Sequence, residues 1–133
     1  MIYALDTNTI SYFIKGDTAV WKKMRAALSE NHDFVIPPVT FYEIRRGFKH
    51  NPAPRKEQLF TDMCLDYSVG EMNITIWEIA ADIYANSKKT GKTIEDTDIL
   101  IAAFCIVNGY TLVSNNTKHF KNIDGLSLEN WVE

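Results

Sequence analysis

The chain has 133 residues, of which 46% are hydrophobic and 23% are charged, and its formal net charge is −3 at pH 7. This length and composition predict one globular domain over residues 1–133 and exclude a disordered or fibrous protein. The slightly acidic balance does not indicate a nucleic-acid-binding protein, although local clusters of Lys and Arg leave a phosphate-binding patch open, because such affinity follows local rather than total charge.

The sequence shows no membrane segment and no disulfide framework. Its longest apolar run, at 99–107, has nine residues, whereas a membrane helix needs about 20. The first residues, MIYALD, contain no basic segment of the kind that begins a signal peptide. Cys64 and Cys105 are 41 positions apart, so we expect free thiols in a reducing compartment. We therefore expect a cytoplasmic protein without membrane contact.

Short apolar runs predict buried strands, and longer stretches with apolar residues at helical spacing predict helices. The expected strands are at 1–5, 34–36, 67–69, 110–113 and 125–131, of which the third is brief. Between the first two strands we expect a helix that ends at Gly16 and a helix that Asp17 caps. Further helices are expected at about 40–48, from Pro54 to Cys64, and at about 76–84 and 95–108. This alternation implies a mostly parallel sheet that helices cover on both faces.

Polar residues follow the expected strands. Asp6 ends the first strand, Glu43 comes shortly after the second, and Ser114-Asn115-Asn116 follows the strand at 110–113. Asp98 opens the apolar helix that precedes this strand. Because the functional crevice of such sheets lies at the carboxyl ends of the strands, we expect these residues to converge there.

Helix capping is the alternative interpretation of some of these acids. Thr40-x-x-Glu43 has the form of a capping box, in which Glu43 would satisfy backbone donors at the start of its helix. Thr93-x-x-Asp96 has nearly the same form. Glu95 and Asp96 in a first helical turn would also gain about 0.3–1 kcal/mol from the helix dipole.

Asp98 and Asp6 are harder to explain as caps, because both adjoin segments that must be buried. An unpaired buried carboxylate is costly, and no Lys or Arg lies between residues 95 and 108. Two such acids in one crevice would repel each other unless a divalent metal lay between them. Oxygen ligands suit Mg²⁺ or Mn²⁺, and the three histidines have no zinc-site spacing. We expect His119 to be a surface residue rather than a catalyst.

Four segments carry a family resemblance: LDTN at 5–8, TFYEIRRG at 40–47, EDTDILIAA at 95–103 and LVSNNTKHF at 112–120. In this order they resemble PIN-domain ribonucleases, most closely the VapC-type toxins of toxin–antitoxin pairs. The resemblance extends to GLSLENW at 125–131. It implies an α/β fold, a PIN-like three-layer α/β/α sandwich with a short, mostly parallel central sheet. It also implies a Mg²⁺-dependent endoribonuclease that cuts tRNA or other structured RNA, forms a homodimer and is bound by a VapB-like antitoxin.

The resemblance also implies roles for the acids. The strand-end Asp of the family falls on Asp6, its helix Glu on Glu43 and its third acid on Asp98. These would be the catalytic residues and the ligands of Mg²⁺, or of Mn²⁺ in its place, with Glu43 binding directly or through water. Asp96 is a further candidate ligand, because some members carry an acid there. Asn116 stands where many members have a fourth acid, and this neutral amide puts a second permanent ion in doubt.

Five further residues are candidates for supporting contacts. Thr7, Asn8 and Ser114 could hydrogen-bond phosphate or metal ligands, although each also suits a turn or a cap. Arg45 and Arg46 follow Glu43 and could contact RNA or the antitoxin. Arg46 could instead pair with Glu43 at i,i+3.

Other functions are also compatible with acids at strand ends. A signalling receiver domain needs a second acid beside the first, but Thr-Asn-Thr follows Asp6. The segment Asp6-Thr7-Asn8-Thr9 resembles a degraded DxDxT phosphatase loop, in which Asn8 replaces the general acid. A PIN-like fold that only binds and does not cleave is a further alternative, which three acids at the motif positions argue against.

Overall fold

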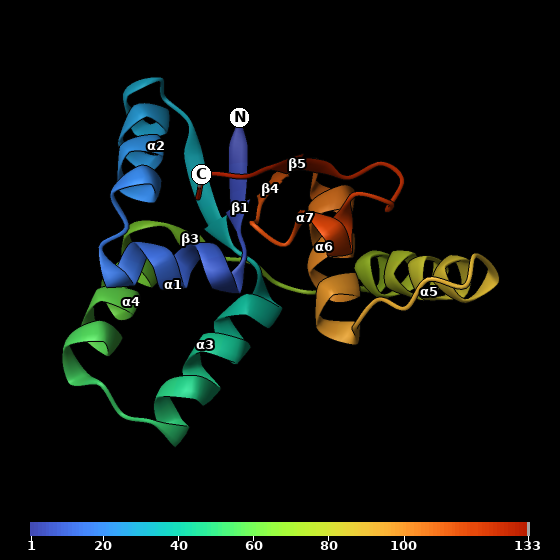
Figure 1. Cartoon of the computed structure of the whole chain (residues 1–133), viewed down its shortest axis with the longest axis horizontal. Coiled ribbons are helices and arrows are strands. Elements are labelled where there is room, and N and C mark those ends of the chain that lie inside the picture. Colours follow the sequence, from blue (N-terminus) through green and yellow to red (C-terminus); the bar gives the residue numbers. More distant parts are fainter. Residues whose placement is uncertain (133) are drawn as a thin grey trace.

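The computed structural model describes residues 1–132 and contains a five-stranded sheet (Figure 1). The strands are β1 (Ile2–Leu5), β2 (Asp33–Ile36), β3 (Ser68–Val69), β4 (Thr111–Val113) and β5 (Ser127–Glu129). Their order is β3-β2-β1-β4-β5, and every neighbouring pair is parallel. The expected domain of residues 1–133 is thus described apart from its last residue, which lies outside the described part.

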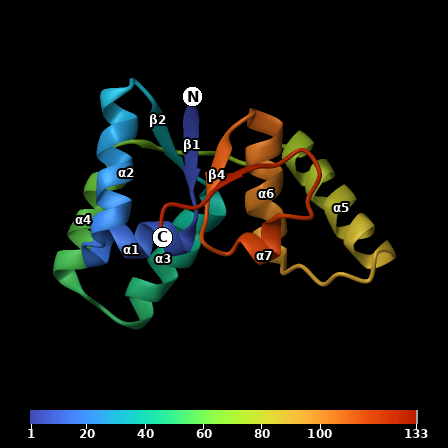
Figure 2. The ribbon, with the colours of Figure 1, turned by 45° about the horizontal axis from the view of Figure 1, so that its top comes forward.

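Helices cover both faces of the sheet, as Figures 1 and 2 show. They are α1 (Thr7–Lys15), α2 (Thr18–Ser29), α3 (Pro38–His50), α4 (Pro54–Asp66), α5 (Ile74–Lys89), α6 (Asp96–Asn108) and α7 (Thr117–Phe120). Helices α1 to α4 lie on one side and α5 to α7 on the other. The prediction of a three-layer α/β/α sandwich is confirmed, with a sheet that is parallel throughout its described strands.

The alternation of side chains along the strands fills two separate cores. Tyr3 and Leu5 of β1 point into the core beneath α1 to α4, whereas Ala4 between them joins the core beneath α5 and α6. In β2, Phe34 likewise joins the core beneath α1 to α4, whereas Val35 joins the core beneath α5 and α6. Because successive side chains of a strand point to opposite faces, a strand buried on both faces needs the continuous apolar runs seen in the sequence.

Helix α6 is the most buried helix, as its apolar sequence predicts. Six of its residues are buried: Ile99, Ile101, Ala102, Ala103, Phe104 and Cys105. The helix ends at Gly109, whose φ of 71° is the left-handed conformation of a C-cap. Within residues 1–132 we find no helix with the length and apolar character needed to span a membrane.

The capping-box interpretation is wrong for both helices. Helix α3 begins at Pro38, which suits a first helical position because proline lacks the amide hydrogen. Thr40 therefore lies inside the first turn, where it is buried and its hydroxyl has no partner among the described residues. Helix α6 begins at Asp96 after Glu95, and the Glu95 side chain makes no capping hydrogen bond. Glu43 and the acids of α6 are thus available for other contacts.

The order of the strands also argues against the receiver-domain alternative. Receiver domains have a doubly wound sheet of order 2-1-3-4-5, whereas the order here is 3-2-1-4-5. The chain moves outward from β1 to β2 and β3, then crosses back to place β4 on the other side of β1. This reversal puts the ends of β1 and β4 beside each other.

Gly70 marks a tight contact between the end of β3 and α6. A Cβ atom at Gly70 would overlap the ring of Phe104, which is buried. We expect Gly70→Ala to lower the free energy of unfolding by about 1–3 kcal/mol, because the ring would have to move within a packed core. Urea denaturation would measure this loss.

Gly47→Ala is the matched control, because Gly47 lies within α3 and a Cβ atom there would meet nothing within 4 Å. Alanine has the higher helix propensity, so this variant should gain up to about 1 kcal/mol. The cost of Gly70→Ala should shrink in a Phe104→Leu background, because the two sites are in contact. A Gly70→Ala protein as stable as the wild type would contradict this packing.

Candidate active site

A polar pocket of about 170 Å³ opens at the carboxyl ends of β1 and β4. This is the point at which the strand order reverses, where ligands of such sheets bind. Its acidic side chains are Asp6, Glu43, Glu95 and Asp98. Thr7, Asn8, Asn116 and His119 also line it. We call this the acid pocket.

Asp6 connects the sheet to the first helix. Its carboxylate is only 3% exposed and accepts the amide hydrogen of Thr9 at 2.8 Å, which caps α1. The Thr9 hydroxyl in turn donates to the carbonyl of Val113 at the end of β4. Burial raises the pKa of Asp6, although hydrogen bonds from Ser114 and Thr9 oppose this, and the charge of Asp98 raises it further.

Asp98 approaches the same pocket from the first turn of α6. Its side chain is 16% exposed, and its Oδ2 lies 3.0 Å from Nδ1 of His119. Burial is the main cause that raises the pKa of Asp98, and the contact with His119 lowers it. The nearby charges of Glu95 and Glu43 add to the rise. Asp6 and Asp98 are therefore both harder to ionise than free aspartate when no cation is present.

Glu43 is held in place by two neighbours. The hydroxyl of Thr7 donates to its Oε1 at 2.6 Å. Its Oε2 lies 3.8 Å from the Arg46 guanidinium, which is the i,i+3 pairing that the sequence allowed. Because each carboxylate oxygen has a neighbour, the Glu43 side chain has a defined orientation at the side of the pocket.

The residues after β4 support the pocket from its other side. Ser114 is fully buried and accepts the amide hydrogen of Asn116 at 3.0 Å. Asn116 is the residue before α7 and lines the pocket, as does Asn8 of α1. The structure thus brings the three predicted acids together with Thr7, Asn8 and Asn116. It also places Ser114 within hydrogen-bonding reach of Asp6.

Two predicted residues lie elsewhere. Asp96 lines a separate hollow between α5 and α6, beside Trp77 and Tyr84. Arg45 lies over the ring of Phe60 and donates to the hydroxyl of Thr61 at 3.0 Å, so it packs against α4. Glu95, which the sequence offered only as a capping residue, lines the acid pocket instead.

His119 is the residue that sequence reasoning missed. Its side chain is 53% exposed, as expected of a surface residue, but it contacts Asp98 in the acid pocket. It belongs to α7, a four-residue helix that the apolar pattern did not predict. The available signal was its position three residues after Asn116, because residues at this spacing share a helix face.

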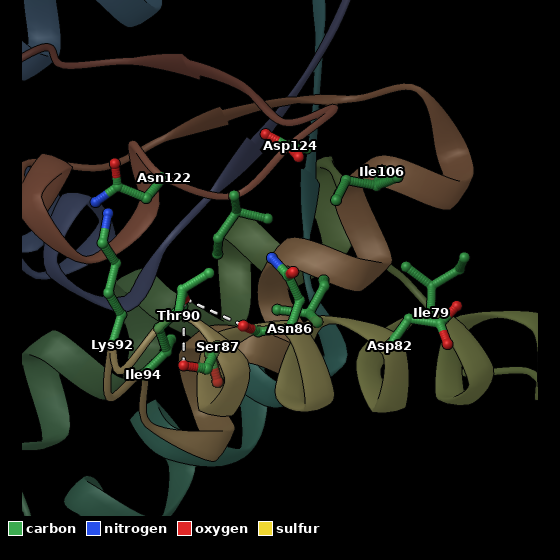
Figure 3. A pocket seen from close by; sticks show the side chains of 12 residues that line it. Ile79, Asp82, Asn86, Ser87, Thr90, Lys92, Ile94, Ile106, Asn122 and Asp124 are labelled. Atoms are coloured by element: carbon green, nitrogen blue, oxygen red, sulfur yellow. Dashed lines mark hydrogen bonds between the residues drawn. The ribbon is translucent and has the colours of Figure 1, made fainter.

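Another pocket, which is larger than the acid pocket at about 280 Å³, lies between α5, the end of α6 and residues 122–124 (Figure 3). Isoleucines form much of its lining, namely Ile79, Ile83, Ile94, Ile106 and Ile123. Asp82 and Asp124 lie apart at its rim, as Figure 3 shows. This pocket offers apolar surface rather than clustered carboxylates, so the acid pocket is the candidate active site.

The PIN domain family model matches residues 3–126 of the chain. The chain belongs to the PIN-domain family. This PIN domain is 32% identical to ribonuclease VapC2 of Rickettsia felis over 98% of both chains. It is 25% identical to the tRNA(fMet)-specific endonuclease VapC of Shigella flexneri over 97% of both. It also matches the crystal structure of VapBC2 from Rickettsia felis bound to promoter DNA, with a TM-score of 0.88, 28% identity and coverage of 98% of this chain and 99% of that one. The resemblance to VapC-type PIN domains is thereby confirmed.

The acid pocket of this PIN domain suits a hard divalent cation. Within residues 1–132, no three acidic, histidine or cysteine side chains stand close enough together to hold one ion. Asp6, which is buried, and Asp98, whose side chain is 16% exposed, would be the direct ligands, with Glu43 bound through water. Mg²⁺ fits such a donor set, because it usually keeps several waters and binds through one or two carboxylates.

The raised pKa of Asp6 leads to a prediction about stability. A carboxyl group with a raised pKa in the folded state favours folding at low pH, and this contribution is lost as the pH rises through that pKa. In EDTA at pH 7, Asp6→Asn should therefore melt at a higher temperature than the wild type, because asparagine keeps the cap without the buried charge. The difference should shrink as the pH falls toward about 4, near the pKa of unfolded aspartate.

Asp17→Asn is the matched control, because Asp17 caps α2 through the amide of Val20 from a less buried position. This variant should show no comparable gain at pH 7. Melting curves of the three proteins between pH 4 and pH 8 would check both expectations. A lower melting temperature for Asp6→Asn at pH 7 would contradict the destabilising effect of this buried charge.

Proposed function

We propose that this PIN domain is a Mg²⁺-dependent endoribonuclease that hydrolyses phosphodiester bonds in tRNA or another structured RNA. The observation that carries the proposal is the meeting of the buried Asp6 and the half-buried Asp98 with Glu43 at the point where the strand order reverses. The names of the relatives from Rickettsia felis and Shigella flexneri support the same activity. Cleavage of such RNA would take place in the cytoplasm and inhibit translation and growth.

The raised pKa values of the two aspartates support a cation in this pocket. A positive ion beside Asp6 and Asp98 would favour their charged forms and offset their repulsion. Bound Mg²⁺ would place positive charge beside the scissile phosphate and lower the pKa of a coordinated water. Mn²⁺ should substitute, because it prefers the same oxygen ligands.

The other residues of the pocket would orient the reactants. Glu43 is held by Thr7 and would position the attacking water or a water between itself and the ion. Asn8 and Asn116 are neutral amides that line the pocket and would donate hydrogen bonds to phosphate oxygens. Ser114 would hold the Asp6 carboxylate in its orientation through a hydrogen bond. The fixed positions of these groups would reduce the ordering required when RNA binds.

We also propose that the chain is the toxin of a pair with a VapB-like antitoxin. The similar VapBC2 complex from Rickettsia felis supports such a partner. Basic or amide side chains of the antitoxin would enter the acid pocket, because its acids outnumber the cationic groups that line it.

A homodimer is the further assembly that we propose. Helix α5 exposes Ile74, Trp77 and Tyr84, which are 75%, 50% and 49% exposed. Trp77 and Tyr84 border the hollow that also contains Leu100. Apolar surface of this kind on a small domain favours a protein interface.

Cleavage assays on bulk tRNA test the proposed reaction. The wild type should cleave with Mg²⁺ or Mn²⁺ and lose this activity in EDTA. Asp6→Asn and Asp98→Asn should each slow cleavage by about 100-fold or more, and the double variant should lose little further activity because the acids act together.

Asp96→Asn is the matched control, because Asp96 shares the first turn of α6 with Asp98 but lines the hollow beside Trp77. It should cleave at nearly the wild-type rate. Full cleavage in EDTA would contradict the role of the metal. A wild-type rate for Asp98→Asn would contradict the assignment of this acid, and a protein that binds RNA without cutting it would be the inactive binding module.

Light scattering tests the proposed dimer. The wild type should have twice the mass of one chain, and Trp77→Lys should shift the protein toward the monomer because a charge would be buried in an apolar interface. Leu65→Lys is the control, since Leu65 is 79% exposed on α4. A monomeric wild type at all concentrations would contradict the dimer.

A further inference from the structure

One contact in the acid pocket links two helices that are distant in sequence. Nδ1 of His119 in α7 lies 3.0 Å from Oδ2 of Asp98 in α6. Within residues 1–132, no other hydrogen bond reaches the Asp98 carboxylate. The chain therefore orients the Asp98 carboxylate through a single imidazole.

The fold fixes the backbone position of His119. Phe120, the next residue, is only 1% exposed and belongs to the core that surrounds α6. The amide of His119 donates to the carbonyl of Asn116 at 2.9 Å, so the turn that presents Asn116 to the pocket also presents His119. Because α7 is anchored through Phe120, His119 is held beside the first turn of α6.

We propose that His119 is a positioning residue for the divalent cation, which fixes one oxygen of Asp98 and leaves the other free to bind the ion beside Asp6. This inference rests on the proposed function of the acid pocket. An ionised carboxylate only accepts hydrogen bonds, so Nδ1 carries the donated hydrogen. In metal sites, ligating carboxylates are themselves hydrogen-bonded, and loss of such a partner typically weakens metal binding or activity by about 10–100-fold.

The acids around Asp98 explain why such a donor is needed. The charges of Glu95 and Glu43 act on Asp98 in the same pocket. Without a donor from His119, no hydrogen bond among the described residues would hold the Asp98 carboxylate against their repulsion. If His119 and Asp98 formed only a surface ion pair, its loss would change stability little and would leave metal affinity unchanged.

Three substitutions of His119 separate these two roles. His119→Ala removes the donor, whereas His119→Asn keeps an amide nitrogen close to the position of Nδ1. His119→Gln places its amide nearer the position of Nε2, beyond the direct contact with Asp98. His32→Ala is the matched control, because His32 forms another histidine–carboxylate pair, at 3.4 Å from Glu30 and remote from the acid pocket.

Isothermal titration with Mn²⁺ alone is the primary measurement, and cleavage of bulk tRNA over a range of Mg²⁺ concentrations is the second. We expect His119→Ala and His119→Gln to bind Mn²⁺ about 10-fold more weakly than the wild type, which is the effect typical of losing a hydrogen-bond partner of a metal ligand. His119→Asn and His32→Ala should stay close to the wild-type affinity. The cleavage rate of His119→Ala should recover at high Mg²⁺, because the defect lies in ion binding.

Two outcomes would overturn the inference while leaving the proposed function intact. One is wild-type Mn²⁺ affinity in His119→Ala while Asp98→Asn loses binding. The other is a His119→Asn protein as weak as His119→Ala, which would show that the donor at Nδ1 is not the property that matters. If the wild type binds no Mn²⁺ and cleaves RNA in EDTA, the proposed metal mechanism fails and this inference fails with it.

Discussion

The burial of the Asp6 carboxylate at the end of β1 is the constraint on which the site depends. The same group caps α1, through the amide of Thr9, and forms the deepest acid of the pocket. The Thr9 hydroxyl also joins α1 to the end of β4. A cap usually stabilises a helix by about 1 kcal/mol, but here the capping charge is removed from water and has another carboxylate nearby. The fold therefore retains a group that is unfavourable without a cation, which is typical of residues kept for function.

The strand order turns this local feature into a site. Because β4 lies beside β1, the turn after Val113 delivers Ser114 and Asn116 next to Asp6. Helix α6 packs against the opposite face from α1 and α3, and its first turn adds Asp98. Each side chain thus comes from the end of a packed element, so the backbone segments that carry the acids have little freedom to move apart. This rigidity favours ion binding over relaxation of the repulsion.

Much of this arrangement could be predicted from the sequence. Apolar runs located the strands, and the rule that parallel strands carry their sites at their carboxyl ends brought Asp6, Glu43 and Asp98 together. The Thr40 capping box was misread because Pro38 starts the helix earlier, so that Thr40 turns into the core. The partner of Asp98 could not be predicted, because it depends on the packing of α7 and not on spacing within α6. His119 illustrates that a contact across 21 positions requires the tertiary structure.

We propose that Asp6 and Asp98 together form the site of one divalent cation. Anomalous diffraction from crystals grown with Mn²⁺ tests it most directly. We expect one strong peak in the acid pocket, within coordination distance of carboxylate oxygens of both Asp6 and Asp98, with Glu43 linked through water. A peak beside Asp96 in the neighbouring hollow, or an empty acid pocket in crystals of protein that cleaves RNA in the same Mn²⁺ buffer, would contradict it.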